Sequence, residues 1–284
     1  MEKKILHILT GRDKQITPEE TIKQPLPHQN FRFANPFIVI HHLPPEEIKP
    51  GSQLRIHPHP HRGFSPVTFT LQGEGFHRDN AGHDNIVKAG DVQWMFAGKG
   101  LLHSEGPTPN LLKNGGVQEF IQIWVNAPAA HKWDAPFYQS AKKEEQPPVL
   151  VQPGVELRLA SGSFDGKIGP LKSHTPVISV VGTVKADINL SIKANEGYWT
   201  LLYIANGSAS VNGNDIDKYQ LVVFDKANTD IDIRTTADTT LLFLSAQPID
   251  EPIAAKDNFV MNTKEEIEQA MEDYKNGVFG ALSH

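Results

Sequence analysis

Short runs of apolar and β-branched residues, separated by turns that contain glycine, follow one another along most of the chain. In the first half this pattern predicts strands at 66–71, 76–79, 86–88, 92–96 and 119–125. The turn at 72–75 contains two glycines, which is typical of links between antiparallel strands. In the second half the predicted strands are 155–159, 178–181, 187–192, 200–205, 207–211, 220–224, 231–234 and 240–245. Many short strands at close spacing predict an all-β fold of the barrel or sandwich type.

Two segments depart from the strand pattern. Residues 17–20 combine a capping pattern with proline at the first helical position, which predicts one helical turn. Near the C-terminus, Thr263 and Glu266 match a capping box, and apolar residues follow at helical spacing up to Gly277. We expect this second segment to form a single amphipathic helix that packs on the outside of a barrel in a structural role.

A polar stretch at 142–148, Lys-Lys-Glu-Glu-Gln-Pro-Pro, separates the two strand series. We therefore expect one domain at 1–140 and a second at 141–284, with the helix at the end of the second. The strand-and-turn pattern at 207–213 is similar to that around 73–76. The two halves are thus interpreted as weak internal repeats of one β-fold.

Composition narrows the classes of protein and of site. The 284 residues are 39% hydrophobic and 21% charged, as in ordinary globular proteins, and no run approaches the about 18 apolar residues of a membrane span. The first residues do not resemble a secretory signal, so a cytoplasmic location and no membrane partner are expected. A formal charge of −6 disfavours direct binding of nucleic acid. Because cysteine is absent, histidine and carboxylate side chains are the strong ligands available.

Candidate metal ligands are concentrated in two short segments. Residues 57–61 contain three histidines at every second position, and His103 and Glu105 follow several predicted strands later. Alternate residues of a strand share one face, so two such strands side by side would present three nitrogens and one oxygen to a divalent ion. The spacing alone does not select which two of the first three histidines bind. The prolines at 58 and 60 lack backbone N–H groups and favour an edge strand.

The other histidines carry weaker signals. We expect surface or outer-shell roles for His77 and His83, and no partner pattern surrounds the rest. The second half contains no cluster of histidine and glutamate, so we expect it to bind no metal. No Ser-His-Asp arrangement, phosphate-binding loop or dinucleotide fingerprint stands out.

At 59–64, His-Pro-His-Arg-Gly-Phe, the sequence resembles the pirin family of the cupin superfamily. Similar motifs are Gly-Asp-Val-Gln-Trp-Met at 90–95, Ala-Gly-Lys-Gly-Leu-Leu-His-Ser-Glu at 97–105, Gln-Ile-Trp-Val-Asn at 122–126 and the segment 259–277. The resemblance implies a bicupin, that is, two β-barrel domains of the cupin type with one metal ion in the first.

The resemblance also implies a ligand set of His59, His61, His103 and Glu105, which makes His57 a neighbour of the site. The metal in this family is usually Fe(II), and the donor set also suits Mn, Ni, Cu, Co or Zn. Ser65 stands where many cupins have a glutamate shortly after the His-x-His pair. We expect the site to be retained, with an altered pocket.

Members of the family include enzymes that open the flavonol quercetin with O₂. Four protein ligands on an ion that prefers about six leave about two positions for a substrate oxygen and O₂. Three neutral imidazoles and one carboxylate leave a net positive charge at a divalent ion, which favours a deprotonated flavonol. The sequence therefore predicts a metal-dependent dioxygenase of the quercetin 2,3-dioxygenase type, in which Glu105 also accepts the proton of the substrate hydroxyl.

Two alternatives remain open. Eukaryotic members of the family act as nuclear transcription cofactors, which implies a metal- or redox-responsive regulator that acts through a protein partner. Capture of such a partner by only one metal state would distinguish this role. The other alternative is a cupin activity on a different small molecule. A monomer is the default for a chain with two barrels.

Overall fold

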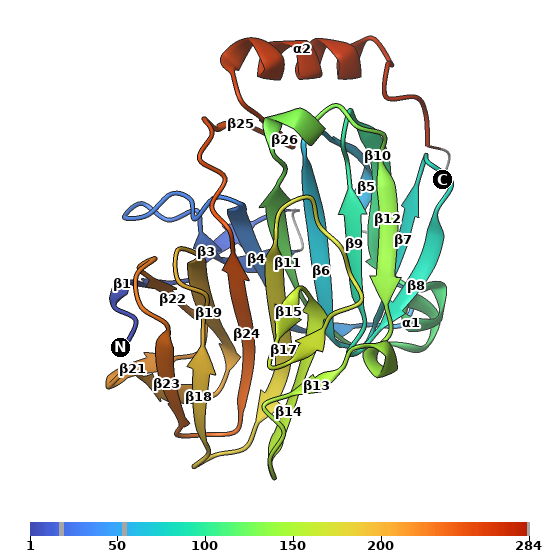
Figure 1. Cartoon of the computed structure of the whole chain (residues 1–284). Coiled ribbons are helices and arrows are strands. Elements are labelled where there is room, and N and C mark those ends of the chain that lie inside the picture. Colours follow the sequence, from blue (N-terminus) through green and yellow to red (C-terminus); the bar gives the residue numbers. More distant parts are fainter. Residues whose placement is uncertain (17–19, 53–55, 283–284) are drawn as a thin grey trace. The chain divides into compact units, whose positions relative to one another are not determined.

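The computed structural model describes residues 1–16, 20–52 and 56–282. These residues form mainly β-strands, with a short helix α1 (Pro109–Asn114) and a longer helix α2 (Lys264–Lys275) near the C-terminus (Figure 1). The predicted all-β class with a C-terminal helix is thereby confirmed. The helical turn expected at 17–20 lies mostly outside the described residues. Within the described ranges, no helix is both long enough and apolar enough to cross a membrane.

The chain divides into two compact units, each made from two separate parts of the sequence. Unit 1 contains Met1–His42 and Lys143–Pro248, and unit 2 contains Leu43–Lys142 and Ile249–His284. Strand β4 (Phe37–Ile48) begins in unit 1 and ends in unit 2.

This division differs at both ends of the chain from the expected domains 1–140 and 141–284. The N-terminal strand β1 pairs with β22, where Ile8 lies opposite Val222, so the start of the chain joins the second strand series. Helix α2 joins the first series instead of the second. Backbone pairing over such distances leaves no mark in the local pattern of apolar residues, so the sequence did not reveal it.

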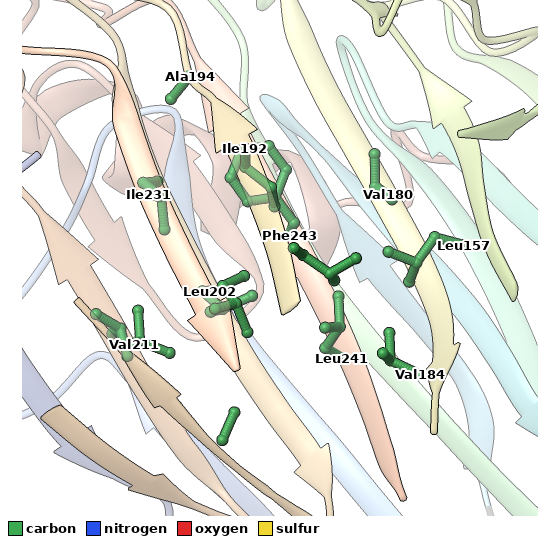
Figure 2. Close-up of a cluster of buried hydrophobic side chains, with 14 of the residues drawn as sticks. Leu157, Val180, Val184, Ile192, Ala194, Leu202, Val211, Ile231, Leu241 and Phe243 are labelled. Carbon is green, nitrogen blue, oxygen red and sulfur yellow. The ribbon is translucent and has the colours of Figure 1, made fainter. Parts of the chain in front are cut away.

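Two antiparallel sheets enclose the apolar core of unit 1. Their strand orders are β1-β22-β19-β24-β17-β14-β13 and β18-β23-β20-β21. Alternate residues of β18 and β23 are buried, so Ile192 and Ile231 face the core, where they join Leu202 and Phe243 of the larger sheet (Figure 2). The strands are β1 (Ile5–Thr10), β2 (Arg12–Gln15), β3 (Thr21–Leu26), β13 (Pro148–Val149), β14 (Val155–Ser161), β15 (Ser163–Phe164), β16 (Lys167–Ile168), β17 (Val177–Val184), β18 (Asn189–Lys193), β19 (Trp199–Asn206), β20 (Ser208–Val211), β21 (Asn214–Asp217), β22 (Gln220–Phe224), β23 (Asp230–Thr235) and β24 (Thr239–Ala246).

Unit 2 places a four-stranded sheet, β5-β10-β7-β8, opposite the strands β12-β9-β6-β11. Contacts between the two sets of strands include polar and aromatic side chains: Glu105 of β10 meets Gln122 of β11, and His77 of β7 stacks on Tyr138 of β12. The strands are β5 (Ile56–His61), β6 (Phe64–Gln72), β7 (Glu74–Asp79), β8 (Asp84–Lys88), β9 (Val92–Phe96), β10 (Leu101–Pro107), β11 (Gly116–Asn126), β12 (Phe137–Ala141), β25 (Ala254–Lys256) and β26 (Phe259–Met261). As the prolines predicted, β5 is an edge strand.

Helix α2 begins with the predicted capping box. The side chain of Thr263 accepts from the backbone of Glu266, and the side chain of Glu266 accepts from the backbone of Thr263. The helix buries Ile267 and Ala270 in a cluster with β26 and with Leu102 of β10. It therefore packs on the strands of unit 2.

Candidate metal centre

Strands β5 and β10 bring three histidines together. The strands pair antiparallel, and His59 lies directly opposite His103. The ring centroids of His59 and His103 are 4.3 Å apart, those of His61 and His103 are 4.8 Å apart, and those of His59 and His61 are 4.9 Å apart. One nitrogen from each ring lies within 4.8 Å of the other two, so the three imidazoles are close enough to bind one ion.

Backbone carbonyls fix the orientation of two of these rings. The Nδ1 atom of His59 lies 2.9 Å from the carbonyl oxygen of His57, and the Nδ1 atom of His61 lies 3.4 Å from that of Asn258. A carbonyl oxygen only accepts, so Nδ1 is the donor in both rings, and in the neutral form of each ring the lone pair is on Nε2. Metal-binding histidines are typically oriented in this way.

His103 is buried, and neither of its ring nitrogens has a hydrogen-bond partner among the described residues. Buried polar atoms are usually paired, so two unpaired nitrogens beside two other imidazoles fit a ligand for an ion. Burial, and next the charge of His59, keep the pKa of His61 and of His103 well below the usual value. Both rings are therefore neutral near pH 7, the state in which imidazole binds a metal.

Glu105, the fourth predicted ligand, lies two residues after His103 on β10 and is bound by an amide. The register of β10 shifts between His103 and Glu105, so the two residues do not follow a regular strand alternation. Gln122 Nε2 donates to both oxygens of the carboxylate, at 3.0 and 3.3 Å, and also to Thr68 Oγ1 at 3.2 Å. The carboxylate is not part of the group of ligand atoms that lie within 4.8 Å of one another.

His57 and Ser65 lie at the margin of this site. The ring of His57 is exposed and outside the three-histidine group, although its carbonyl orients His59. Ser65 is buried near the start of β6, opposite Val125. Its short side chain occupies little of the interior at a position where many cupins have a glutamate.

A second polar group lies next to His103. His77 is fully buried, its ring centroid is 5.4 Å from that of His103, and its Nε2 atom lies 3.0 Å from the carboxylate of Asp79. Asp79 also binds His83 Nδ1 at 2.9 Å. Burial alone would raise the pKa of Asp79, but the hydrogen bonds from these histidines lower it. Burial, followed by the charge of Asp79, raises the pKa of Tyr138, which stacks on His77.

Sequence reasoning assigned His77 and His83 surface or outer-shell roles and did not identify Asp79, Gln122 or Tyr138. The pair His77 and Asp79, two residues apart on one strand, carried the same spacing signal as the predicted ligands. For Gln122 and Tyr138 no such signal exists, because their partners lie on distant strands.

Comparison with known proteins matches both halves of the chain. The Pirin family model matches residues 16–125, and the model of the Pirin C-terminal cupin domain matches residues 179–280. A Pseudomonas aeruginosa protein that carries the provisional name quercetin 2,3-dioxygenase is 34% identical over 250 residues, which are 87% of each chain. Pirin-1 of Arabidopsis thaliana is 33% identical over 229 residues, 78% of this chain and 77% of that one.

A solved structure is similar over the whole length. The crystal structure of quercetin 2,3-dioxygenase from Acinetobacter baumannii covers 100% of both chains with a TM-score of 0.94 and 30% sequence identity. The two-cupin fold implied by the sequence resemblance is confirmed.

Proposed function

This chain belongs to the pirin family, and on that premise we propose that it is a metal-dependent dioxygenase that opens a flavonol such as quercetin with O₂. The observation that carries the proposal is the group of His59, His61 and His103. Within the described part of the chain, both ring nitrogens of buried His103 lack a partner. Similarity to the quercetin 2,3-dioxygenase of Acinetobacter baumannii supports the reaction class.

The three histidines would hold the ion through ring nitrogens, and Glu105 would add an oxygen ligand. Two of these rings, His61 and His103, are neutral near pH 7. Three imidazoles and a carboxylate suit a borderline divalent ion, and we propose Fe(II). When bound, this ion supplies a Lewis acid and an electron donor for O₂.

The side chains around the histidines suit a flat aromatic substrate. Trp124 is half-buried, and its ring centroid lies 5.6 Å from that of His61 and 4.4 Å from that of Phe64. Aromatic faces of this kind stack well on planar rings. Glu105 would accept the proton of the substrate hydroxyl, while the amide of Gln122 holds its carboxylate.

The test is oxygen uptake by Fe(II)-loaded protein with quercetin. A dioxygenase places both atoms of O₂ in its products, so oxygen and quercetin should disappear in a ratio of one to one. We expect His59→Ala and Glu105→Ala to abolish uptake. His57→Ala is the matched control, because His57 shares the strand but not the three-histidine group, and it should retain activity.

Absence of uptake with any flavonol would contradict the dioxygenase proposal. If the protein nevertheless bound one metal ion per chain, and lost it in His59→Ala, the regulatory alternative would become the leading one. A wild-type protein that binds no metal would contradict both.

A further inference from the structure

Consecutive residues at the end of β5 are held by the C-terminal part of unit 2. The Nδ1 atom of His61 donates to the carbonyl oxygen of Asn258. The carbonyl oxygen of Arg62 accepts from the backbone N–H of Val260 at 3.1 Å. At Gly63, whose φ is +83°, an added Cβ would lie 2.1 Å from the carbonyl oxygen of Val260. The two backbones therefore run in direct contact beside a proposed ligand.

Lys132 joins the same two backbones from inside the unit. Its side chain is fully buried, and its amine donates to the carbonyl oxygens of Gly63 and Val260, each at 2.8 Å. The amine of Lys132 also donates a third hydrogen bond, to Oδ1 of Asn126 at 2.6 Å. All three protons of the ammonium group are thus used.

Arg62 connects the ligand strand to helix α2. Its side chain is only 3% exposed, and its guanidinium donates to Asp273 at 2.7 Å and to the carbonyl oxygen of Lys99 at 2.7 Å. The guanidinium also lies over the rings of Phe279 and Trp133, 4.5 and 5.0 Å from their centroids. A buried charge needs such pairing, and here the paired carboxylate belongs to a helix about 210 residues away in sequence.

Packing alone does not require this ion pair. The apolar face of α2 already buries Ile267 and Ala270 against Phe259 and Leu102. Buried ion pairs add little net stability compared with apolar residues, but they fix relative positions because either partner left alone is costly. The position fixed here is that of Arg62, the residue next to His61.

We propose that residues 258–273 position the metal ligand His61, with Arg62 and Asp273 as positioning residues. This inference rests on the proposed metal centre of unit 2. It assigns α2 more than the purely structural role expected from its apolar stripe. Since His61 and Arg62 are adjacent, loosening Arg62 frees the backbone that carries the ligand, and the ring then no longer keeps its orientation toward His59 and His103.

The experiment measures metal binding, with Mn²⁺ as the probe. Asp273→Asn keeps the shape of the side chain and removes its charge. We expect it to weaken Mn²⁺ binding about tenfold, the lower end of the range for residues that orient ligands. The rise in melting temperature on addition of Mn²⁺ should shrink accordingly, because less binding energy is linked to the folded state.

Two further variants keep the test specific. Glu272→Gln makes the same charge change at the adjacent, exposed position of α2 and should change the dissociation constant less than twofold. Asp273→Glu retains the charge beside Arg62 and should restore most of the affinity. If Asp273→Asn lowers the melting temperature equally with and without Mn²⁺ and leaves the dissociation constant within twofold, the helix is merely structural and the inference is overturned.

Metal binding and catalysis are measured separately, the first by Mn²⁺ affinity and the second by O₂ consumption. Wild-type protein that binds Mn²⁺ but, loaded with Fe(II), consumes no O₂ with a flavonol contradicts the proposed reaction, while the affinities of the Asp273 variants still decide the positioning role. Wild-type protein that binds no Mn²⁺ overturns both.

Discussion

The buried histidines of the two units differ in what their ring nitrogens bind. In unit 1, Nδ1 of the buried His42 lies 3.0 Å from the hydroxyl of Tyr203, and Nε2 of the partly buried His41 lies 3.0 Å from the amide oxygen of Gln24. In unit 2, His103 is as buried as His42, yet neither of its nitrogens has a hydrogen-bond partner in the part of the chain that the structure describes. A buried imidazole with a protein partner supports the fold, whereas one without a partner beside other imidazoles is a candidate ligand.

The interiors of the two units also differ, because that of unit 1 is apolar and that of unit 2 is partly polar. The core of unit 1 consists of leucine, valine, isoleucine, alanine and phenylalanine side chains from both of its sheets. In unit 2 the sheets meet partly through His77, Gln122, Glu105 and Tyr138. The proposed ligand site thus takes the place of apolar packing in one barrel, and the other barrel retains a continuous core.

The largest expected effect separates the two kinds of buried histidine. His103→Leu should weaken metal binding more than about 100-fold, beyond the range for residues that only orient ligands, and should abolish oxygen uptake with quercetin. Because it removes two unpaired polar atoms, the melting temperature of the metal-free protein should not fall. Metal titration and thermal unfolding of the same samples provide both readouts.

His42→Leu is the counterpart in unit 1. It leaves the buried hydroxyl of Tyr203 without this partner, so the free energy of unfolding should fall by about 1–3 kcal/mol while metal affinity stays unchanged. If His103→Leu destabilised the metal-free protein as much as His42→Leu does, the distinction between the two histidines would be wrong.

A smaller effect is expected from the amide that holds Glu105. Gln122→Leu removes the donor to the carboxylate and should weaken metal binding about tenfold. Thr68→Val removes only the other acceptor of this amide and should change affinity less than threefold. Equal effects of the two substitutions, measured by metal titration, would show that Gln122 acts through packing.

The smallest expected effect is a pH dependence that originates in unit 1. Burial, and next the charge of Lys14, lower the pKa of His41 to about 3, while the unfolded chain keeps the ordinary value of 6.5. The unfolded state therefore binds more protons below pH 6.5, and stability falls as pH decreases toward 3. Between pH 7 and 5.5 the loss should be about 1.2 kcal/mol.

His41→Gln should remove this part of the pH dependence without a change in metal affinity. Urea unfolding of both proteins at the two pH values measures the difference. Parallel stability curves for the two proteins would contradict the low pKa of His41.

The sequence predicted features that depend on local patterns. The strands at 92–96 and 220–224 have the predicted bounds, and the capping box of α2 is present. Spacing on strands predicted that histidines of 57–61 lie close to His103, whereas the choice of His59 and His61 was implied by the family resemblance. Strand β4 continues through Pro44 and Pro45, which no alternation of apolar residues marks.

What the sequence could not reveal depends on distant contacts or local irregularity. No residue type marks the register shift between His103 and Glu105 in the sequence. The hydrogen bond between Gln122 and Glu105 was therefore not predicted. The ion pair of Arg62 and Asp273 joins two ordinary charged residues far apart in the chain, and many other pairs would have been equally plausible. Only the folded backbone selects among them.

Unit 2 is completed late in translation because its last part, Ile249–His284, follows the strands of unit 1. All four proposed metal ligands are synthesised before Lys143–Pro248, and residues 258–273 are synthesised only afterwards. A nascent chain therefore contains the ligands but lacks the segment that holds the end of β5. We expect tight metal retention only once synthesis has passed α2, so that unfinished chains do not withhold metal from completed ones.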